Sequence, residues 1–356
     1  MDEKMQIPLL KKQILLMWVF LLPLILLAQK PSTVKVIGTG DIMLGNTYPP
    51  DHQLLPADGG RHLFDEVKPY LRAADVAFGN LEGVLMDSVG EPRPRGNTSV
   101  PYYIFKMPEK SVNLLLDAGY DIVSVANNHV NDFQSLGRNR TQQVLRSAGL
   151  KFAGSSTQKS IVFEKNGVKY GFCAFSTAYD SPSIYNASRA KDLISELSDK
   201  CDIVIVSFHG GQEGSQYTHL PFASEYGMGN SCGDLYVFAH ACVDAGADIV
   251  FGHGPHVARA VELYKGRFIA YSLGNFCTPY GMNITGVSGY APMIQVEVKL
   301  DGQFVEGQIF AAKQVWGRGP KMDAAKSVVK EIKTLTEEDF PESLLQISDS
   351  GKITRK

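Results

Sequence analysis

Apolar runs that end in polar residues recur four times along the chain. Residues 76–78, 122–125, 203–206 and 249–251 consist mainly of Val, Ile, Phe and Ala, and none alternates strictly with polar side chains. Such runs are typical of strands that are covered on both faces, as in α/β sheets. Each run follows a predicted helix and a short loop that carries an aspartate. We therefore predict an α/β fold built from recurring helix–strand units.

Helical patterns fill much of the chain between these runs. We predict a first strand at residues 34–40 and helices at residues 63–72, 109–118, 134–148, 190–200 and 233–245. The spacing of these units is irregular, which excludes a solenoid of repeated units.

Hairpin signals gather in the second half of the chain. Asn166-Gly167 is the strongest of them, and turns are also expected at residues 265–266 and 301–302. The sequence after Trp316 is polar and charged with little apolar period. We predict one domain over residues 31–316 and a polar C-terminal extension over 317–356, either a peripheral helix or a loose tail.

The N-terminal region has the pattern of a targeting segment. Lys11 and Lys12 precede an uncharged apolar stretch at residues 14–28, which is short for a membrane span and contains a proline. Residues 1–30 are therefore predicted to be a secretory signal peptide, with an uncleaved N-terminal anchor as the alternative. In either case we expect an exported protein that is periplasmic, extracellular or anchored in the membrane.

Composition and charge exclude several classes of function. The chain has 356 residues and a formal net charge of −2, with no basic stripe, so nucleic acid is not an expected partner. The five cysteines form no CxxC pair, which argues against a zinc ribbon or a thioredoxin-like site. One disulfide among Cys232, Cys242 and Cys277 is left open.

Residues of metal-ligand type follow each of the four apolar runs. Glu82, Asn128 and His209 come directly after three of the runs, and His253 and His256 lie on the Gly/Pro turn after the fourth. Ligands of α/β sheets gather beyond the carboxyl ends of the strands. We therefore expect these side chains to converge, although they lie far apart in the sequence.

Six segments in this order resemble a known family. They are Gly40–Gly45, Asn80–Gly83, Ala126–His129 with Asp132, His209–Glu213, Gly252–His256 and Ser272–Phe276. The sequence between Val34 and Ala311 resembles the CapA family of poly-γ-glutamate capsule biosynthesis proteins, which belongs to the calcineurin-like metallophosphoesterase superfamily.

The resemblance implies a four-layer α/β/β/α sandwich of the metallophosphatase type, with a metal centre at one end. One or two divalent ions (Mn, Fe or Zn) are expected, since carboxylate, amide and imidazole ligands suit these metals. The implied metal ligands are Asp41, Glu82, Asn128, His209, His253 and His256. The implied catalytic pair is His129 with Asp132, and Asn80, Lys106, Glu213 and Asn275 are expected to contact substrate. His52, His62, His219 and His240 match no motif and are expected outside the site.

Several positions depart from the pattern that the resemblance sets. Met43 stands where the superfamily commonly has a histidine, and Glu82 replaces an aspartate. Gly210 and Gly254 stand where the CapA pattern usually has a tryptophan and a histidine. These changes put a second metal ion in doubt.

Two functions follow as hypotheses. The first is an exported, metal-dependent hydrolase of capsule or cell-envelope polymer biosynthesis, acting on a phosphoester or on a γ-glutamyl amide. Its expected partners are an anionic polymer or phosphoester substrate and, as candidates, membrane proteins of capsule synthesis. The second is a non-catalytic binding or assembly factor for an anionic polymer, built on the same fold with a weakened site.

Overall fold

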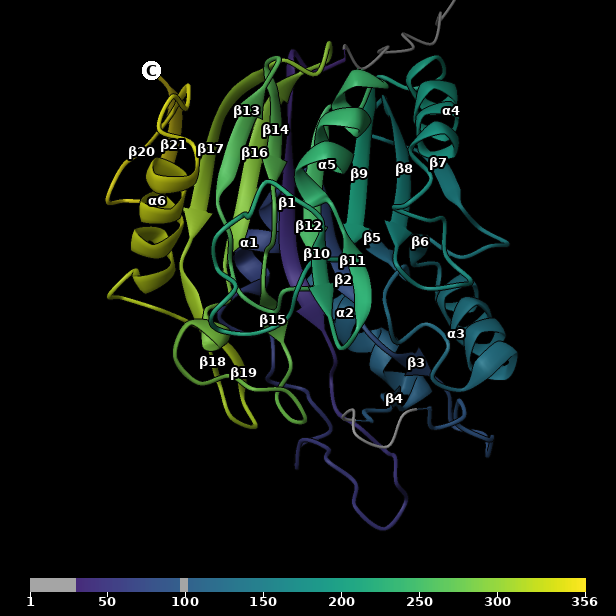
Figure 1. Cartoon of the computed structure of the whole chain (residues 1–356). Coiled ribbons are helices and arrows are strands. Elements are labelled where there is room, and N and C mark those ends of the chain that lie inside the picture. Colours follow the sequence, from purple (N-terminus) through teal and green to yellow (C-terminus); the bar gives the residue numbers. More distant parts are fainter. Residues whose placement is uncertain (1–29, 97–101) are drawn as a thin grey trace, which may run out of the picture.

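A computed structural model describes residues 30–96 and 102–356, and the predicted signal peptide or anchor lies outside these residues. Within them, the larger of two main sheets has the strand order β20-β21-β17-β16-β1-β2-β5-β6, with β15 beside β1 (Figure 1). Its strands are β1 (Thr33–Ile42), β2 (Val76–Leu81), β5 (Ile122–Ser124), β6 (Lys151–Ala153), β15 (Asn275–Cys277), β16 (Met293–Lys299), β17 (Phe304–Phe310), β20 (Leu345–Ile347) and β21 (Lys352–Arg355).

The smaller main sheet has the order β13-β14-β12-β9-β8-β7. Its strands are β7 (Ser160–Lys165), β8 (Val168–Ser176), β9 (Ile203–His209), β12 (Ile249–His253), β13 (Val261–Tyr264) and β14 (Arg267–Ala270). Three short pairs complete the described strands: β3 (Val84–Leu85) with β4 (Lys106–Met107), β10 (Glu225–Gly227) with β11 (Asn230–Gly233), and β18 (Ala312–Val315) with β19 (Gly319–Met322).

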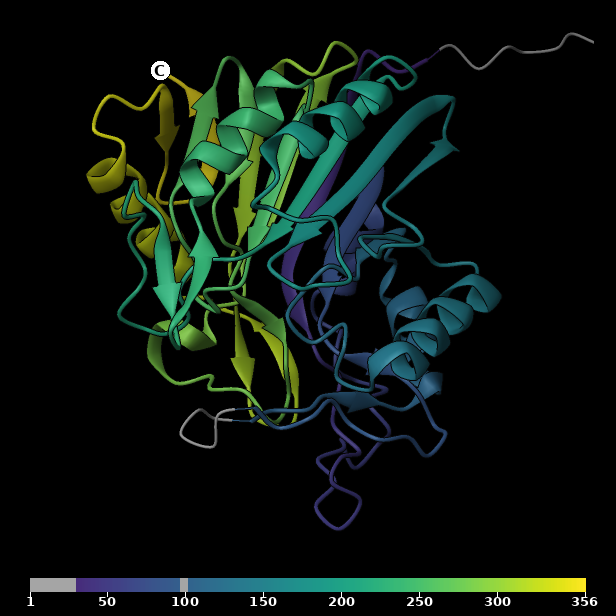
Figure 2. The same ribbon diagram turned by 45° about the vertical axis from the view of Figure 1, so that its right-hand side comes forward.

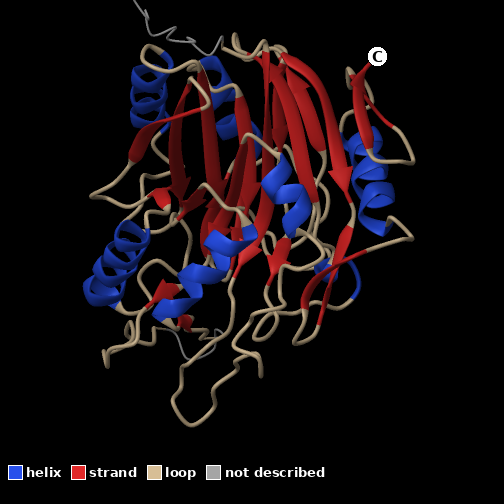
Figure 3. Ribbon diagram, turned by 180° about the vertical axis from the view of Figure 1, so that it is seen from behind, coloured by secondary structure: helices blue, strands red, loops and turns tan. Residues whose placement is uncertain are grey.

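The two main sheets pack face to face, and helices cover their outer faces. A core cluster between the sheets contains Phe78 from β2, Phe172 from β8 and Phe251 from β12. Helices α1 (Lys68–Ala73), α2 (Val112–Ala118) and α3 (Gln134–Ala148) lie on the larger sheet (Figure 3). Helices α4 (Ala187–Ser198) and α5 (Leu235–Asp244) lie on the smaller sheet (Figures 1 and 2). The four-layer α/β/β/α sandwich that the sequence predicted is confirmed.

The aspartate that precedes each apolar run has a structural reason. Asp75 accepts a hydrogen bond from the backbone N–H of Lys35 at 2.8 Å, and Asp121 accepts one from Ala77 at 2.9 Å. In the smaller sheet, Asp202 accepts from Lys169 and Asp248 from Val204, both at 2.8 Å. Each carboxylate thereby satisfies a donor at the start of the neighbouring parallel strand.

Most predicted elements occur, with shifted ends. The three hairpin turns join β7 to β8, β13 to β14 and β16 to β17, as expected. The helix predicted at 63–72 is present only as α1, Lys68–Ala73, because Pro69 favours the first helical turn and the preceding residues form turns. Helix α5 begins at Leu235, since the Asp234 side chain accepts a hydrogen bond from Val237 N–H at 3.0 Å.

The region after Trp316 contains a helix, as one of the two predicted alternatives had it, but this helix and the strands that follow it pack into the fold and do not form a loose tail. Strands β20 and β21 extend the larger sheet beyond β17. Helix α6 (Ser327–Asp339) buries Val328, Val329 and Ile332 in the core between the sheets. These apolar residues have helical spacing, a short signal inside a charged sequence.

Two sequence-based expectations concern the cysteines and membrane spans. The five cysteines, all within the described residues, are free, so the disulfide that was left open does not form. Among the helices of residues 30–96 and 102–356, none combines the length and hydropathy that crossing a bilayer requires.

Candidate metal centre

Acidic and imidazole side chains meet where the parallel strands of both sheets end. Asp41 lies near the end of β1, Glu82 directly follows β2, and His209 and His253 are the last residues of β9 and β12. Ligand atoms of Asp41, Glu82 and His209 all lie within 4.8 Å of one another, and all three residues are buried. The cross-strand pairing of His209 with His253 fixes these two imidazoles side by side.

Asp41 is held by imidazoles from the last residue of β12 and from the turn after it. Its Oδ2 lies 2.9 Å from Nδ1 of His256, and its Oδ1 lies 3.2 Å from Nδ1 of His253. Burial raises the pKa of Asp41, but the two neighbouring histidines outweigh it and hold this pKa well below its usual range. The carboxylate is therefore ionised, as a metal ligand must be.

The pKa values of His253 and His256 are shifted in opposite directions. Burial lowers the pKa of His253, which favours the neutral ring that binds metals. Burial also acts to lower the pKa of His256, but the carboxylates of Glu82, Asp41 and Glu213 raise it to about 10. Nε2 of His256 lies 3.7 Å from Oε1 of Glu82.

Several buried polar atoms in this cluster have no hydrogen-bond partner among the described residues. They are both carboxylate oxygens of Glu82, Oδ1 of Asn128, Nε2 of His209 and both ring nitrogens of His253. Buried polar groups are normally paired, because leaving one unpaired costs free energy. A set of unpaired oxygen and imidazole atoms that face one another fits a divalent cation. The residues present therefore can hold a divalent metal.

His129 stands beside this cluster as part of a pair with Asp132. Its Nδ1 lies 2.7 Å from Oδ2 of Asp132, while its Nε2 lies 3.9 Å from Oε1 of Glu82. The Phe105 ring stacks on the imidazole with ring centroids 4.0 Å apart. Burial lowers the pKa of His129, but the carboxylates of Asp132, Glu82 and Glu213 outweigh burial, so the net shift is upward. The ring is thus fixed with Nε2 toward the cluster.

Asp132 is fully buried and receives two further hydrogen bonds. The backbone N–H of Phe105 donates to Oδ2 at 2.7 Å, and Nε of Arg93 donates to Oδ1 at 3.0 Å. These donors fix the carboxylate that orients His129. Phe105 and Arg93 were not predicted from the sequence, since neither lies in one of the six recognised segments.

Two of the four residues that were predicted to contact substrate, Asn80 and Lys106, do not line the cavities over the cluster. Asn80 is fully buried and donates from Nδ2 to Oδ1 of Asp41 at 2.8 Å, so it positions that carboxylate. The Lys106 amine donates to the Ser88 carbonyl at 2.9 Å and lies over the Phe133 ring. Neither residue lines the cavities described below.

The other two predicted substrate contacts do face the site. Glu213 accepts a hydrogen bond from Nδ2 of Asn128 at 3.3 Å, and its Oε1 lies 3.9 Å from Nε2 of His256. Asn275 lines a cavity, but its Nδ2 donates to backbone carbonyls of His256, Asn283 and Ser288. Its amide therefore orders the loops around the site, while its Oδ1 is unpaired.

Asn127 was also missed as a supporting residue, although it belongs to a recognised segment. Its Nδ2 donates to the Leu81 carbonyl at 2.8 Å and to Oδ1 of Asn80 at 3.3 Å. Its Oδ1 accepts from the backbone N–H of His129 at 3.1 Å. The side chain thus joins the ends of β2 and β5 immediately behind the metal centre.

A buried ion pair holds the loop that carries Glu213. Arg259, with 1% of its surface exposed, donates to both carboxylate oxygens of Glu225 at 2.8 Å, and its Nε donates to the Tyr217 carbonyl at 2.9 Å. Glu225 in turn accepts from the backbone N–H of Gln212 at 2.9 Å. No sequence motif marked this pair.

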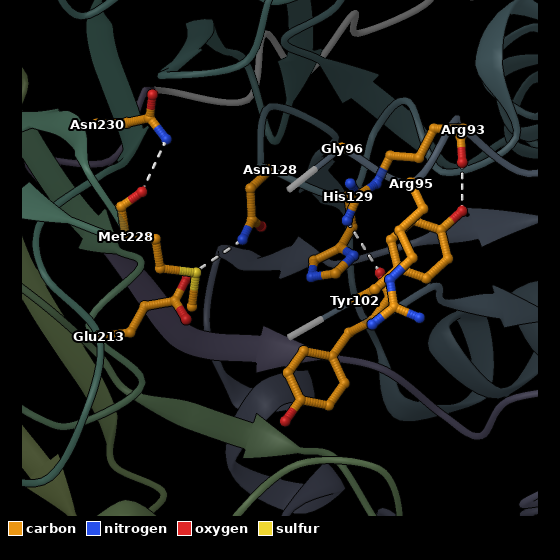
Figure 4. A pocket seen from close by; sticks show the side chains of 10 residues that line it. Arg93, Arg95, Gly96, Tyr102, Asn128, His129, Glu213, Met228 and Asn230 are labelled. Carbon is orange, nitrogen blue, oxygen red and sulfur yellow. Dashed lines mark hydrogen bonds between the residues drawn. The ribbon is translucent and has the colours of Figure 1, made fainter. Parts of the chain in front are cut away.

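Two cavities meet over the cluster. The first, of about 440 Å³, and the second, of about 320 Å³, share Tyr103, His129, Glu213 and Met228 in their walls. Asn128 lines the first cavity, and His256 and Asn275 line the second. Figure 4 shows His129 and Asn128 at the middle of the first cavity. The candidate metal centre is therefore open to a ligand through Asn128 on the side of the first cavity and His256 on the side of the second.

The histidines that match no motif lie elsewhere, as expected. His52 is exposed, and His62 forms a surface contact with Asp65 at 2.7 Å. His219 pairs with Asp339 at 2.7 Å, and His240 pairs with Glu262 at 2.8 Å. None of the four lines either cavity.

The departures at Gly210 and Gly254 lie in contact with each other. Gly254 has a φ of +117°, and a Cβ there would stand 2.3 Å from the Gly210 carbonyl oxygen. A Cβ on Gly210 would stand 2.8 Å from the Cys232 carbonyl oxygen. The third departure, Met43, is fully buried within an apolar cluster. The imidazole that the superfamily commonly has at this position is therefore replaced by a side chain that packs in the core.

The model of a known family, described as "Bacterial capsule synthesis protein PGA_cap", matches residues 35–280. A PGA biosynthesis protein CapA from Bacillus subtilis is 30% identical over 279 residues, covering 74% of this chain and 67% of that protein. The chain belongs to the PGA_cap family. All the metal-ligand candidates in the cluster lie inside the matched region.

Matches to two further relatives span a similar share of this PGA_cap protein. A capsule biosynthesis protein CapA from Bacillus anthracis is 28% identical, and the match covers 69% of this chain but only 60% of that protein. A probable polyglutamine synthesis accessory protein from Mycobacterium tuberculosis is 26% identical, with 74% of this chain and 78% of that protein covered.

Similar solved structures are more distant. A hypothetical protein from Thermus thermophilus has 18% identity and a TM-score of 0.46, covering 78% of this chain and 99% of that one. The calcineurin-like phosphoesterase YfkN from Bacillus subtilis has 12% identity and a TM-score of 0.44, covering 87% and 98%. The family assignment rests on the sequence match and not on these likenesses.

Proposed function

We propose that this PGA_cap protein is an exported, metal-dependent hydrolase that acts on a phosphoester or γ-glutamyl amide bond of a capsule or cell-envelope polymer. The observation that carries the proposal is the set of buried, unpaired ligand atoms around Glu82, His209 and His253. His129 faces the same set and is oriented by Asp132. Export rests on the apolar stretch at residues 14–28.

The residues divide into ligands and a proton donor. Asp41, Glu82, Asn128, His209, His253 and His256 would hold the metal, for which Mn, Fe and Zn are the candidates. A bound divalent ion polarises the bond under attack and lowers the pKa of water. With Nδ1 committed to Asp132, His129 presents Nε2 to the cavities and can protonate the leaving group there.

The test combines metal analysis with turnover. Purified protein is analysed for bound Mn, Fe and Zn, and is then assayed on bis-aryl phosphate, mono-aryl phosphate and γ-glutamyl peptides. We expect metal at one or two ions per chain and turnover that falls about 10²- to 10⁴-fold in His129→Ala, the usual contribution of general acid catalysis. His240→Ala, which alters a histidine outside the cavities, is the matched control. Turnover that His129→Ala leaves unchanged would contradict the proposal.

A second candidate is a non-catalytic binding or assembly factor for an anionic polymer. The observation in its favour is Met43, which is buried among apolar side chains where the superfamily commonly has a histidine. This candidate predicts stoichiometric binding of polymer with no turnover in any metal. The same assays therefore separate the two candidates.

A further inference from the structure

The first cavity has opposite charges on its two sides. Arg93 and Arg95 line one side together with Tyr102, and Glu213 lines the other. Figure 4 shows the two arginines and Tyr102 grouped on one side of His129, with Glu213 and Met228 on the opposite side. An acidic group that enters this cavity is drawn toward the arginines and repelled by Glu213. The cavity therefore favours one orientation of an anionic ligand.

The arginine side is held in place before any ligand binds. The guanidinium carbons of Arg93 and Arg95 lie 5.0 and 5.8 Å from the centroid of the Tyr102 ring. The Tyr102 hydroxyl donates to the Arg93 carbonyl, and Nη2 of Arg93 donates to the Tyr103 carbonyl at 3.1 Å. Contacts of cations with an aromatic face limit side-chain freedom, so less entropy is lost on binding.

Arg93 and Arg95 make different contacts and therefore have different roles. Nε of Arg93 is bound to Asp132, which orients His129, so Arg93 is a positioning residue for the catalytic pair. Arg95 is exposed and lines the cavity without a contact to that pair. Arg95 is therefore the arginine of this cavity that can be changed without removing a contact of the Asp132–His129 pair.

The second cavity has a different character. Phe105, Met282, Asn283 and Ser288 line it, and no lysine or arginine occurs among its described lining residues. Because both cavities share His129 and Glu213, a chain that fills them passes over the metal centre. Among the described lining residues, arginines therefore occur only in the first cavity, whereas His256 lines the second.

We propose that Arg95, braced by Tyr102 beside Arg93, forms a subsite for one carboxylate of the substrate chain, while the rest of the chain continues into the second cavity. An arginine binds a carboxylate through two parallel hydrogen bonds, which fixes its orientation. A γ-linked glutamyl chain carries such a carboxylate on every residue. Cleavage of a bond at His129 rests on the proposed function, whereas binding of a carboxylate at Arg95 does not require cleavage.

Binding is measured by fluorescence anisotropy, with no turnover needed. The probes are a labelled γ-glutamyl pentamer and the same pentamer with its α-carboxylates converted to carboxamides. Arg95→Glu is expected to weaken binding of the charged pentamer by about tenfold, the loss of one charge-assisted interaction, and to leave the carboxamide pentamer unaffected. Arg95→Lys should give a smaller loss, since the charge stays and the paired geometry is lost.

Arg189→Glu is the matched control, because Arg189 is an exposed arginine on α4, outside both cavities, and the change in net charge is identical. Equal loss for both pentamers in Arg95→Glu, no loss for the charged pentamer, or equal loss in Arg189→Glu would overturn the subsite. If no ester or amide is hydrolysed in any metal but the charged pentamer still depends on Arg95, the hydrolase proposal fails and the subsite stands.

Discussion

Carboxylates stand at both ends of the parallel strands, and the two groups have opposite surroundings. At the starting end, Asp75, Asp121, Asp202 and Asp248 each accept a backbone N–H of a neighbouring strand. At the finishing end, both oxygens of Glu82 are buried without a hydrogen bond and face imidazoles. Carboxylates thus accept backbone hydrogen bonds at one end of the sheet, whereas at the other end the carboxylate of Glu82 has no hydrogen bond and could bind a cation.

The difference teaches that the lack of a hydrogen-bond donor, and not residue type or burial, sets Glu82 apart from the structural carboxylates. Asp41, at the same end as Glu82, is hydrogen-bonded: its two histidines keep it ionised and Asn80 donates to its Oδ1. Glu82 lacks any such donor. The predictions below change individual members of each group, from the largest expected effect to the smallest.

Replacing Glu82 by glutamine should abolish tight metal binding, because it removes the charge of the central ligand. In metal-free protein the same change should lower the pKa of His256, because the carboxylate of Glu82 is the largest of the charges that raise it. Elemental analysis of bound metal and an NMR titration of the imidazoles check both effects. A variant that keeps its metal would show that Glu82 is not a ligand.

Truncating Arg259 tests a buried charge at the finishing end that is fully paired. Arg259→Ala leaves the Glu225 carboxylate buried without its counter-ion, so we expect a loss of about 3–5 kcal/mol in the free energy of unfolding. Arg259→Met combined with Glu225→Leu should recover much of it, because no charge remains unpaired. Thermal and urea unfolding measure the difference. A double variant as unstable as the single one would contradict this account.

Replacing Asp121 by alanine tests the starting end. Its carboxylate accepts from Ala77 N–H and pairs with Lys165 at 2.7 Å, so its loss should destabilise the protein by about 1.5–3 kcal/mol. Metal content should remain unchanged, which distinguishes it from Glu82→Gln. Loss of metal in this variant would mean that the two ends of the sheet are not independent.

The smallest effect is a dependence on pH. Burial raises the pKa of Asp248 to about 6, against the N–H of Val204 and the charge of Arg267, which act to lower it. The folded state then binds more protons between about pH 4 and 6, so stability falls as the pH rises through that window, on the order of 1 kcal/mol per pH unit. Asp248→Asn should remove this slope, as urea midpoints at several pH values will reveal.

Asp202 gives the contrast within the same group. Its contacts with Lys30 and with the N–H of Lys169 lower its pKa despite burial. Its contribution to stability is therefore present above the unfolded pKa and is lost as the pH falls below about 4. Asp202→Asn should differ from the parent at pH 7 and converge with it in acid. Opposite behaviour would show that Lys30 does not bind there.

The sequence predicted which side chains come together wherever they lie at the end of a parallel strand. Asp41, Glu82, His209 and His253 converge because strand ends share one edge of each sheet, a rule that needs no coordinates. The hairpins were predictable on similarly local grounds, whereas the four layers followed from the resemblance to the CapA family. The positions of Asn80 and Lys106 were not, because the direction of a side chain near a strand end depends on its partners across the fold.

Contacts between distant segments were beyond the sequence. Arg93 reaches Asp132 from a loop with many prolines, and no spacing links the two. The C-terminal strands join the larger sheet through pairing with β17, which a short apolar pattern within a charged stretch does not announce. Both contacts join segments that are distant in the sequence, and the local sequence pattern of either segment does not predict them.

The contact between Gly210 and Gly254 restricts how this chain can change. Any side chain at Gly254 would strike the Gly210 carbonyl, so the loop over residues 210–214 would have to retreat. Glu213 is on that loop and would withdraw from Asn128 and His256. A side chain at Gly254 is therefore incompatible with the present position of this loop, and with it the present walls of both cavities.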